Sequence, residues 1–343
     1  MIHRTLAAAQ AVTIAISLAP ALVAAQSNPS IPRTAWGSPD LQGVWNNSTL
    51  TPFQRPTELG DQEFLTEEEA AGIEQRAANR NLDLAGRSAL RTVVEPNGSV
   101  DRGVDGAPGS YNNFWMERGS TVVSTKRTSI IVDPPSGRLP ALTPETEAWL
   151  NSTEANRLAD VRGGRLPTDT YEQLDLGDRC IWYRGIPSFP TAYNNNYQIF
   201  QNQDFVAIVQ EHIHDVRFIP IDGRPHITTS IRQYAGDSRG RWEGDTLVVE
   251  TTHFNDQAFI RNFNSNLSQA LHVVERLTRI DANTIDYEFT VIDPVTWVRP
   301  WGGSLPLTRS EGPMFEYACH EGNYGLTNML AGSHTQERAD GNR

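Results

Sequence analysis

The chain has 343 residues and a formal net charge of −12 at pH 7, with 41 acidic against 29 basic residues. This acidity argues against nucleic acid and anionic membrane surfaces as partners, because both would repel the protein. The length suits one large domain or two small ones.

The chain opens on a pattern typical of an export signal. His3 and Arg4 form a short positive segment, residues 6–22 are apolar and rich in alanine, and residues 23–25 are the small residues that a signal peptidase needs. We therefore expect residues 1–25 to be removed and the mature protein to be periplasmic or secreted, with no membrane contact after cleavage. A retained anchor helix is the alternative, although the apolar run is short for a membrane span.

Residues 26–61 are rich in Pro, Ser and Asn, which predicts an extended arm, and residues 62–343 are expected to form a single β-rich domain. Gly43-Val44-Trp45 matches the G-x-W that opens the first strand of lipocalins. The alternative is that Trp45 plugs the core from an arm without strand structure. We favour this alternative, because a match of three residues is short.

Two peripheral helices are expected. Thr66 and Glu69 form a capping box for a helix over residues 66–79. Thr143 caps a second helix over residues 144–159, in which Pro144 takes the first position.

The stretch from residue 193 to 301 predicts a series of β-hairpins. Period-two alternation or an apolar run marks strands at residues 205–210, 216–221, 231–235, 247–252, 271–280 and 284–292. Asp222-Gly223 and residues 281–283 are turn sequences. A meander this long must curl or close to protect its edges. The expected fold class is therefore mainly β: an antiparallel β-barrel or strongly curved sheet of lipocalin-like type, with an N-terminal arm and two peripheral helices.

Four motifs resemble a group of exported bacterial proteins that carry no assigned function. They are WGSPDLQGVW at 36–45, YNNFW at 111–115, WEGDTLVVET at 242–251 and CHEGNY at 319–324. The resemblance covers nearly the whole mature chain and implies export and one continuous module. It implies no catalytic residue.

Cys180 and Cys319 are the two cysteines of the chain. In an oxidising compartment a lone pair usually forms a disulfide, which is the interpretation we favour. The alternative gives Cys319 a role as nucleophile or metal ligand beside His320 and Glu321. If Cys319 is bridged, His320 and Glu321 are either a rigid acid–base pair or the closing turn of the last strand.

Residues 211–215, with the sequence EHIHD, are the densest cluster of titratable groups. If the strand continues, His212 and His214 point to one face and, with His226, offer three ligands for a divalent metal. The second interpretation is acid–base chemistry by His214 with Asp215. The third is a polar strand end in which the histidines are satisfied by hydrogen bonds.

Two further patterns allow both a functional and a structural interpretation. Residues 236–240 match the G-x-S-x-G of a nucleophile elbow, but a helix should follow and does not, which favours a hairpin tip. Rings next to amide and guanidinium groups can bind a cyclic ligand, although core packing and cation–π pairs explain them equally well. The substrate-binding candidates of this kind are Tyr111, Trp115, Tyr193, Asn195, Arg217, Arg232 and Trp242.

The function that we expect is an exported lyase, isomerase or hydrolase without a cofactor, acting on a small cyclic or aromatic-stacking molecule. His214, Asp215, His212 and His320 are its candidate acid–base groups. Phosphate loops and dinucleotide fingerprints are absent from the sequence, so a nucleotide cofactor is not expected. The alternatives are a periplasmic carrier with the same cup, and a metal-dependent enzyme using His212, His214 and His226. The titratable groups of residues 210–217 favour an enzyme over a carrier.

Overall fold

The computed structural model describes residues 31–88, 116–162, 168, 170–257, 267–339 and 341. The expected export signal and two of the substrate-binding candidates, Tyr111 and Trp115, lie outside these residues. Among the helices of the described part, none is long and apolar enough to cross a membrane.

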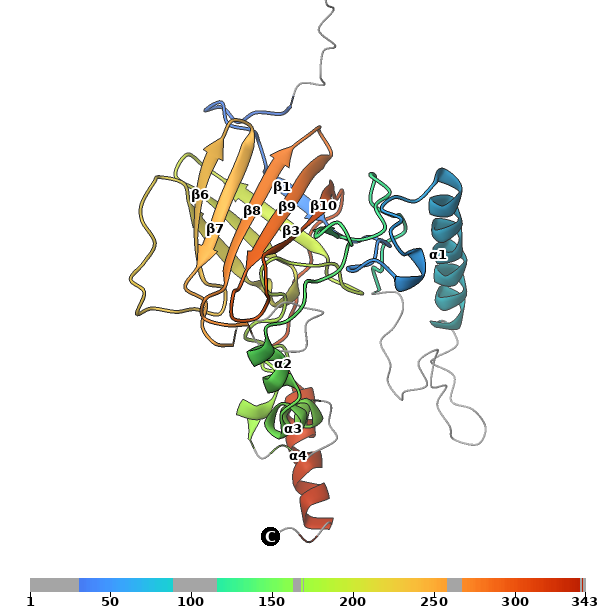
Figure 1. Ribbon diagram of the computed structural model, residues 1–343, viewed down its shortest axis with the longest axis vertical. Coiled ribbons are helices and arrows are strands. Elements are labelled where there is room, and N and C mark those ends of the chain that lie inside the picture. Colours follow the sequence, from blue (N-terminus) through green and yellow to red (C-terminus); the bar gives the residue numbers. More distant parts are fainter. Residues whose placement is uncertain are drawn as a thin grey trace, which may run out of the picture.

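One nearly closed antiparallel sheet dominates the molecule (Figure 1), which confirms the expected fold class. Its strand order is β5-β4-β3-β1-β10-β9-β8-β7-β6, and β2 pairs with β10. The strands are β1 (Gly43–Asn46), β2 (Ile131–Asp133), β3 (Asn196–Gln201), β4 (Phe205–Gln210), β5 (Val216–Pro220), β6 (Asp237–Glu243), β7 (Thr246–Thr252), β8 (His272–Arg279), β9 (Thr284–Ile292) and β10 (Trp301–Arg309).

The two end strands, β5 and β6, meet without a hydrogen-bonded ladder between them. They lie so close that a Cβ atom at Gly240 would be 2.9 Å from Ile219 Cγ2 and 2.8 Å from Ile221 Cγ2. Because Gly240 has no side chain, β5 and β6 can approach closely although no hydrogen-bonded ladder joins them.

Side chains of β8 and β9 alternate between the barrel interior and its surface, as the period-two pattern predicts. In β8 and β9, Leu277 opposes Tyr287 and both are buried, whereas the residues between the inward positions are more exposed. Asp281 Oδ1 accepts the Asn283 backbone N–H at 2.6 Å and shapes the turn between these strands. Large inward side chains, among them Trp45, Phe289 and Trp301, fill the interior.

The N-terminal arm proved to contain a central strand. β1 lies between β3 and β10, and Trp45 is fully buried. The Trp45 indole N–H donates to the Leu41 carbonyl at 2.8 Å, and the Arg279 guanidinium lies 4.9 Å from the ring centroid. Our preference for an arm without strand structure was therefore wrong, because residues 196–201 and 301–309 supply pairing partners that the local composition does not reveal.

The expected strand at residues 231–235 is also absent. Its backbone forms only an isolated bridge, from Gln233 to Phe254, and the segment belongs to the loop between β5 and β6. By contrast, β10 extends the sheet to Arg309, beyond the expected limit at residue 301.

Four helices lie outside the barrel (Figure 1): α1 (Glu67–Ser88), α2 (Pro144–Leu150), α3 (Thr153–Arg162) and α4 (Tyr324–Ala339). The predicted capping box begins α1: Glu69 Oε2 accepts from the Thr66 N–H at 2.8 Å, and Thr66 Oγ1 accepts from the Glu69 N–H at 3.2 Å. The helix continues past residue 79 to Ser88.

The expected helix at residues 144–159 is split in two. Thr143 caps α2 as predicted. The Ser152 hydroxyl accepts the Ala155 N–H at 3.1 Å, so that a new helix begins where a single one was expected. Helix α4 was not predicted from the sequence.

Cys180 and Cys319 form a disulfide, as predicted. The bond joins the loop before β3 to the segment after β10, across 139 residues of sequence. It therefore fixes the C-terminal segment against the end of the barrel.

Candidate functional site

The EHIHD segment forms a tight turn rather than a continued strand. After β4, residues His212–His214 make a 3-10 turn in which Ile213 and His214 take left-handed backbone conformations, with φ of 62° and 48°. These residues turn the chain, so His212 is buried and His214 is exposed. The prediction that both imidazoles point to one face is wrong for this reason.

Tyrosine rings enclose His212. The ring centroids of Tyr183 and Tyr317 lie 4.2 Å and 4.5 Å from the His212 centroid, in stacked orientation. Tyr193, a predicted ligand-binding residue, stacks at 5.6 Å. The histidine therefore anchors an aromatic cluster at the end of the barrel.

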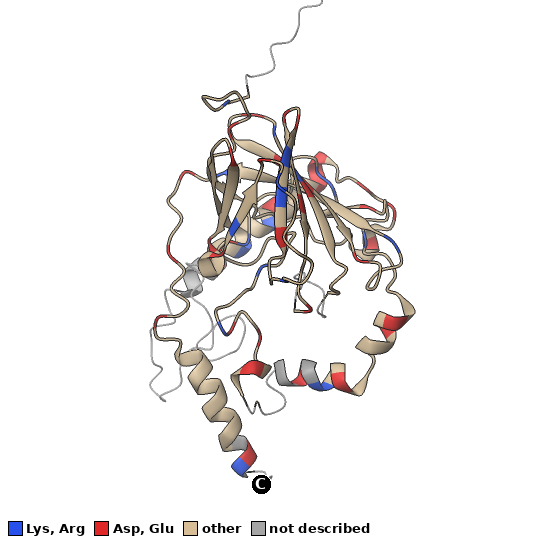
Figure 2. Cartoon of the chain, turned by 90° about the vertical axis from the view of Figure 1, so that its left-hand side faces the viewer, with Lys and Arg blue, Asp and Glu red and all other residues tan. Residues whose placement is uncertain are grey.

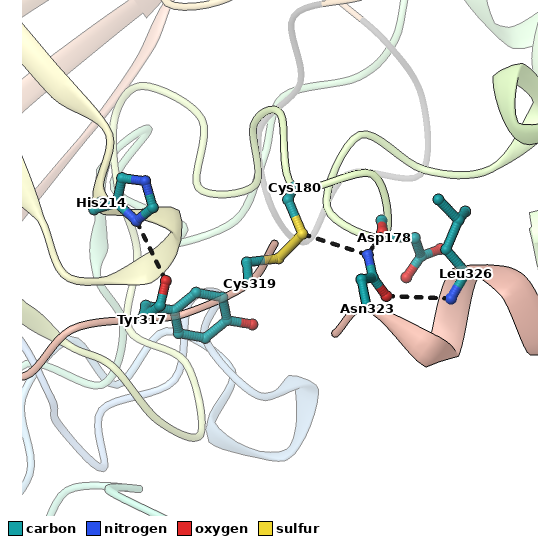
Figure 3. Close-up of a disulfide and its surroundings, with 7 residues drawn as sticks. All are labelled: Asp178, Cys180, His214, Tyr317, Cys319, Asn323 and Leu326. Atoms are coloured by element: carbon teal, nitrogen blue, oxygen red, sulfur yellow. Dashed lines mark hydrogen bonds between the residues drawn. A yellow bond between two sulfur atoms is a disulfide. The ribbon is translucent and has the colours of Figure 1, made fainter. Parts of the chain in front are cut away.

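The disulfide holds one side of this cluster in place through Tyr317. Tyr317 lies two residues before Cys319, and its carbonyl oxygen is 3.2 Å from His214 Nδ1 (Figure 3). Bridging Cys319 to Cys180 thus positions the segment that both covers His212 and contacts His214. His320 is exposed, and its backbone carbonyl accepts the Asn323 N–H.

Asp215 is the most unusual acid of this end of the barrel. Its Oδ2 atom is buried and has no hydrogen-bond partner among the described residues. Burial raises the pKa of Asp215 to about 7, because the carboxylate loses water without gaining a donor. Such a carboxyl can both give and take a proton near neutral pH.

Arg217 does not neutralise Asp215, because its guanidinium is paired with Glu275. Inside the barrel its guanidinium makes a bidentate pair with Glu275, at 3.0 Å for Nη1–Oε1 and 2.5 Å for Nη2–Oε2. The Tyr287 hydroxyl donates to Glu275 Oε1 at 2.8 Å. Burial, together with the Glu275 charge, raises the pKa of Tyr287 well above its usual value, so the hydroxyl stays a donor. Arg217 is therefore part of the core and is not placed to bind a ligand outside it.

Two further acids, Glu117 and Glu211, lie near the start of β3, and Glu117 was not predicted from the sequence. Glu117 Oε1 accepts from Asn46 Nδ2 at 2.6 Å, and Glu211 Oε2 accepts from Asn196 Nδ2 at 2.9 Å. Burial raises the pKa of Glu117, and the Glu211 charge raises it further against the Asn195 N–H hydrogen bond, which lowers it. Glu117 stands in a loop without periodicity, so no sequence pattern marked it.

A cleft of about 390 Å³ lies beside Glu117, because Arg118 and Ala192 line it. The Glu117 N–H donates to the Ala192 carbonyl, and the Asn195 side chain binds Thr191. The cleft is lined by Thr49, Thr51, Phe53, Arg118, Ile130, Phe189, Pro190, Thr191 and Ala192. Asn195 does not line the cleft, but its side chain accepts the N–H of Thr191, which does line it.

The remaining candidates are not gathered at Asp215. Arg232 Nη1 donates to the Phe254 and Gln269 carbonyls, both at 3.0 Å, and so ties loops together. Trp242 packs half-buried against the core. Ser238 lies inside strand β6, so the hairpin tip expected at residues 236–240 is wrong; its hydroxyl is 2.9 Å from Thr251 Oγ1.

The structure brings His226 to Asp237 and His253 rather than to His212 and His214. His226 Nδ1 lies 2.7 Å from Asp237 Oδ2, and one potential ligand atom from each of the three residues lies within 4.8 Å of the others. In the described part of the chain this is the one group of three or more His, Cys, Asp or Glu residues with such spacing. The ligand set His212–His214–His226 is therefore not assembled, because His212 is enclosed by tyrosines.

Comparisons with known proteins place this chain in no group: no family model, no curated protein and no solved structure matches it.

Proposed function

We propose that the protein is an exported enzyme without a nucleotide cofactor, in which Asp215 transfers protons to and from a small cyclic or aromatic-stacking organic molecule. The observation that carries this proposal is the state of the Asp215 carboxyl. One of its oxygens is buried without a partner among the described residues, and burial raises its pKa to about 7. A carboxyl held only for structure would be expected to have a cation or several N–H donors beside it.

The surroundings supply what a proton-transfer site needs. His214 is exposed next to Asp215, and the disulfide-held Tyr317 carbonyl orients its ring through Nδ1. Left-handed backbone at Ile213 and His214 is of the kind that concentrates at functional sites. In this proposal His214 exchanges protons with solvent or substrate, and Asp215 acts as the second acid–base group.

A carrier is the weaker alternative. A lipocalin-type carrier needs a mainly apolar cup, but here large aromatic side chains and the Arg217–Glu275 pair occupy the barrel interior. A small molecule would instead bind at the end of the barrel, where the cleft beside Glu117 presents aromatic, hydroxyl and guanidinium groups. Export agrees with the disulfide, because such bonds persist in oxidising compartments.

The test compares the wild-type protein with Asp215→Asn, His214→Ala and the control Asp204→Asn, which changes an exposed acid at the β3–β4 turn. Proteins are incubated in D2O with cyclic ketones, lactones and aryl esters, and NMR follows deuterium incorporation and hydrolysis. We expect Asp215→Asn to lose turnover by a factor of about 10² or more, as removal of a general acid–base group does, while the control keeps it. Full turnover by Asp215→Asn, or an Asp215 carboxyl that ¹³C NMR titrates near pH 4, would exclude the proposal.

A further inference from the structure

We propose that His226, Asp237 and His253 form a binding site for a divalent first-row transition metal ion, where β6 begins and β7 ends. The site uses residues other than Asp215 and His214 and goes beyond the proposed proton transfer. Two imidazoles and one carboxylate are the nitrogen and oxygen donors that Zn²⁺ and Fe²⁺ prefer, whereas Mg²⁺ and Ca²⁺ prefer oxygen alone.

Strand register places two of the three ligands. Asp237 is the first residue of β6 and pairs with Thr252, so His253 follows one residue beyond that pair. The His253 carbonyl accepts the Gln233 N–H at 3.0 Å, and the Gln233 carbonyl accepts the Asn255 N–H at 3.0 Å. These contacts fix His253 in a left-handed conformation, with φ of 60°. The third ligand, His226, comes from the loop between β5 and β6.

Two of the three ligands, Asp237 and His253, are oriented by a contact outside the group. Arg239 Nη1 binds Asp237 Oδ1 at 2.7 Å, which leaves Oδ2 directed at His226. His253 Nδ1 lies 2.7 Å from the Thr252 hydroxyl. With Nδ1–H donating to that hydroxyl, the lone pair of His253 is on Nε2. Outer contacts of this kind are what orient the first-shell ligands of protein metal sites.

The unpartnered nitrogen argues for a ligand rather than for a structural His–Asp pair. His253 Nε2 is buried and has no hydrogen-bond partner among the residues that the structure describes. An ion pair between His226 and Asp237 would explain their own contact, but it leaves this buried acceptor without a role. A metal ion explains all three side chains at once. The ligand atoms lie within 4.8 Å of one another, which is on the scale of the roughly 3.4 Å separation set by metal–ligand bonds of about 2.1 Å, so small side-chain adjustments would complete the site.

The number of protein ligands bears on what such a site can do. Structural zinc sites are closed by four protein ligands, whereas sites with three keep a position for water or substrate. A metal ion bound by His226, Asp237 and His253 would therefore keep at least one coordination position open.

The experiment uses the mature protein after treatment with EDTA and dialysis. Calorimetric titration with Zn²⁺ is repeated for His226→Ala, for His253→Asn and for the control His320→Gln, which removes an exposed histidine elsewhere. Asn tolerates the left-handed backbone of residue 253 but is too short to replace Nε2. We expect one equivalent of Zn²⁺ for the wild type and the control, no binding of Mg²⁺, and at least about 100-fold weaker Zn²⁺ binding in both ligand variants.

X-ray absorption of the zinc-loaded wild type provides a measurement that does not depend on the folding of any variant. Two imidazoles and additional oxygen scatterers in the zinc shell are the expected result. Fewer than two imidazoles, or unchanged Zn²⁺ affinity in His226→Ala and His253→Asn, would overturn the proposal, as would the absence of stoichiometric binding to the wild type.

Discussion

The buried carboxyl of Asp215 makes a quantitative prediction about stability and pH. Burial raises its pKa from 3.8 to about 7. In the unfolded chain the carboxyl ionises above about pH 4, whereas in the folded protein it stays protonated up to about pH 7. The folded state therefore binds more protons than the unfolded state over this window, and the contribution of Asp215 to stability is lost as the pH rises from about 4 to about 7.

The size of the effect follows from the same shift. Each pKa unit corresponds to about 1.4 kcal/mol, so the full loss is about 4 kcal/mol, and solvent that reaches the half-buried side chain reduces it to about 2–4 kcal/mol. Asp215→Asn keeps the shape of the side chain and cannot ionise. Relative to the wild type, we therefore expect its free energy of unfolding to rise by about 2–4 kcal/mol between pH 4 and pH 7 and to stay level above pH 7.

Urea unfolding followed by circular dichroism, at half-unit steps from pH 4 to pH 8, measures this difference. Groups that titrate in both proteins cancel when the wild-type curve is subtracted from the variant curve. Asp204→Asn, at an exposed turn, is the control. A flat difference for Asp215→Asn would refute the assignment of a desolvated, partnerless carboxyl, and the basis of the proposed proton transfer with it.

Two further predictions concern the bonds that hold the barrel together. Glu275→Gln should cost about 3–5 kcal/mol in urea unfolding, because it leaves the Arg217 charge buried without compensation. The double variant Arg217→Met with Glu275→Leu should cost less than the single one, and an equal or larger cost would contradict this account. Replacing Cys180 and Cys319 by Ala should lower the unfolding free energy by about 2–5 kcal/mol, because the bridge closes 139 residues of chain. Mass spectrometry of a non-reduced wild-type digest should recover the linked peptides, and free thiols at both positions would count against the bridge.

Charge on the outer wall illustrates why composition alone says little about local sites. Acidic and basic residues both occur on the barrel strands (Figure 2), and Arg241 pairs with both Glu243 and Glu250. Exposed pairs of this kind contribute little to stability, but they keep the wall polar.

The sequence by itself determined the elements whose signals are local. Alternation over β8 and β9 reflects one face in the core and one in water, so it can be recognised without a partner strand. The capping box at Thr66 satisfies helix N–H groups with side chains three residues apart, which any helix start would require. The disulfide followed from a count of two cysteines and from the expectation of an oxidising compartment.

Only the tertiary structure decided where the chemistry gathers. Strand β1 needed two partners distant in sequence, and the EHIHD segment left the strand direction because Ile213 and His214 adopt left-handed backbone that no periodicity encodes. Asp237 and His253 are separated by a whole hairpin, and His226 reaches them from another loop. Such clusters depend on strand register and on loop paths, which are set by the packing of the whole barrel. The local sequence around each residue therefore does not predict which other residues it will meet.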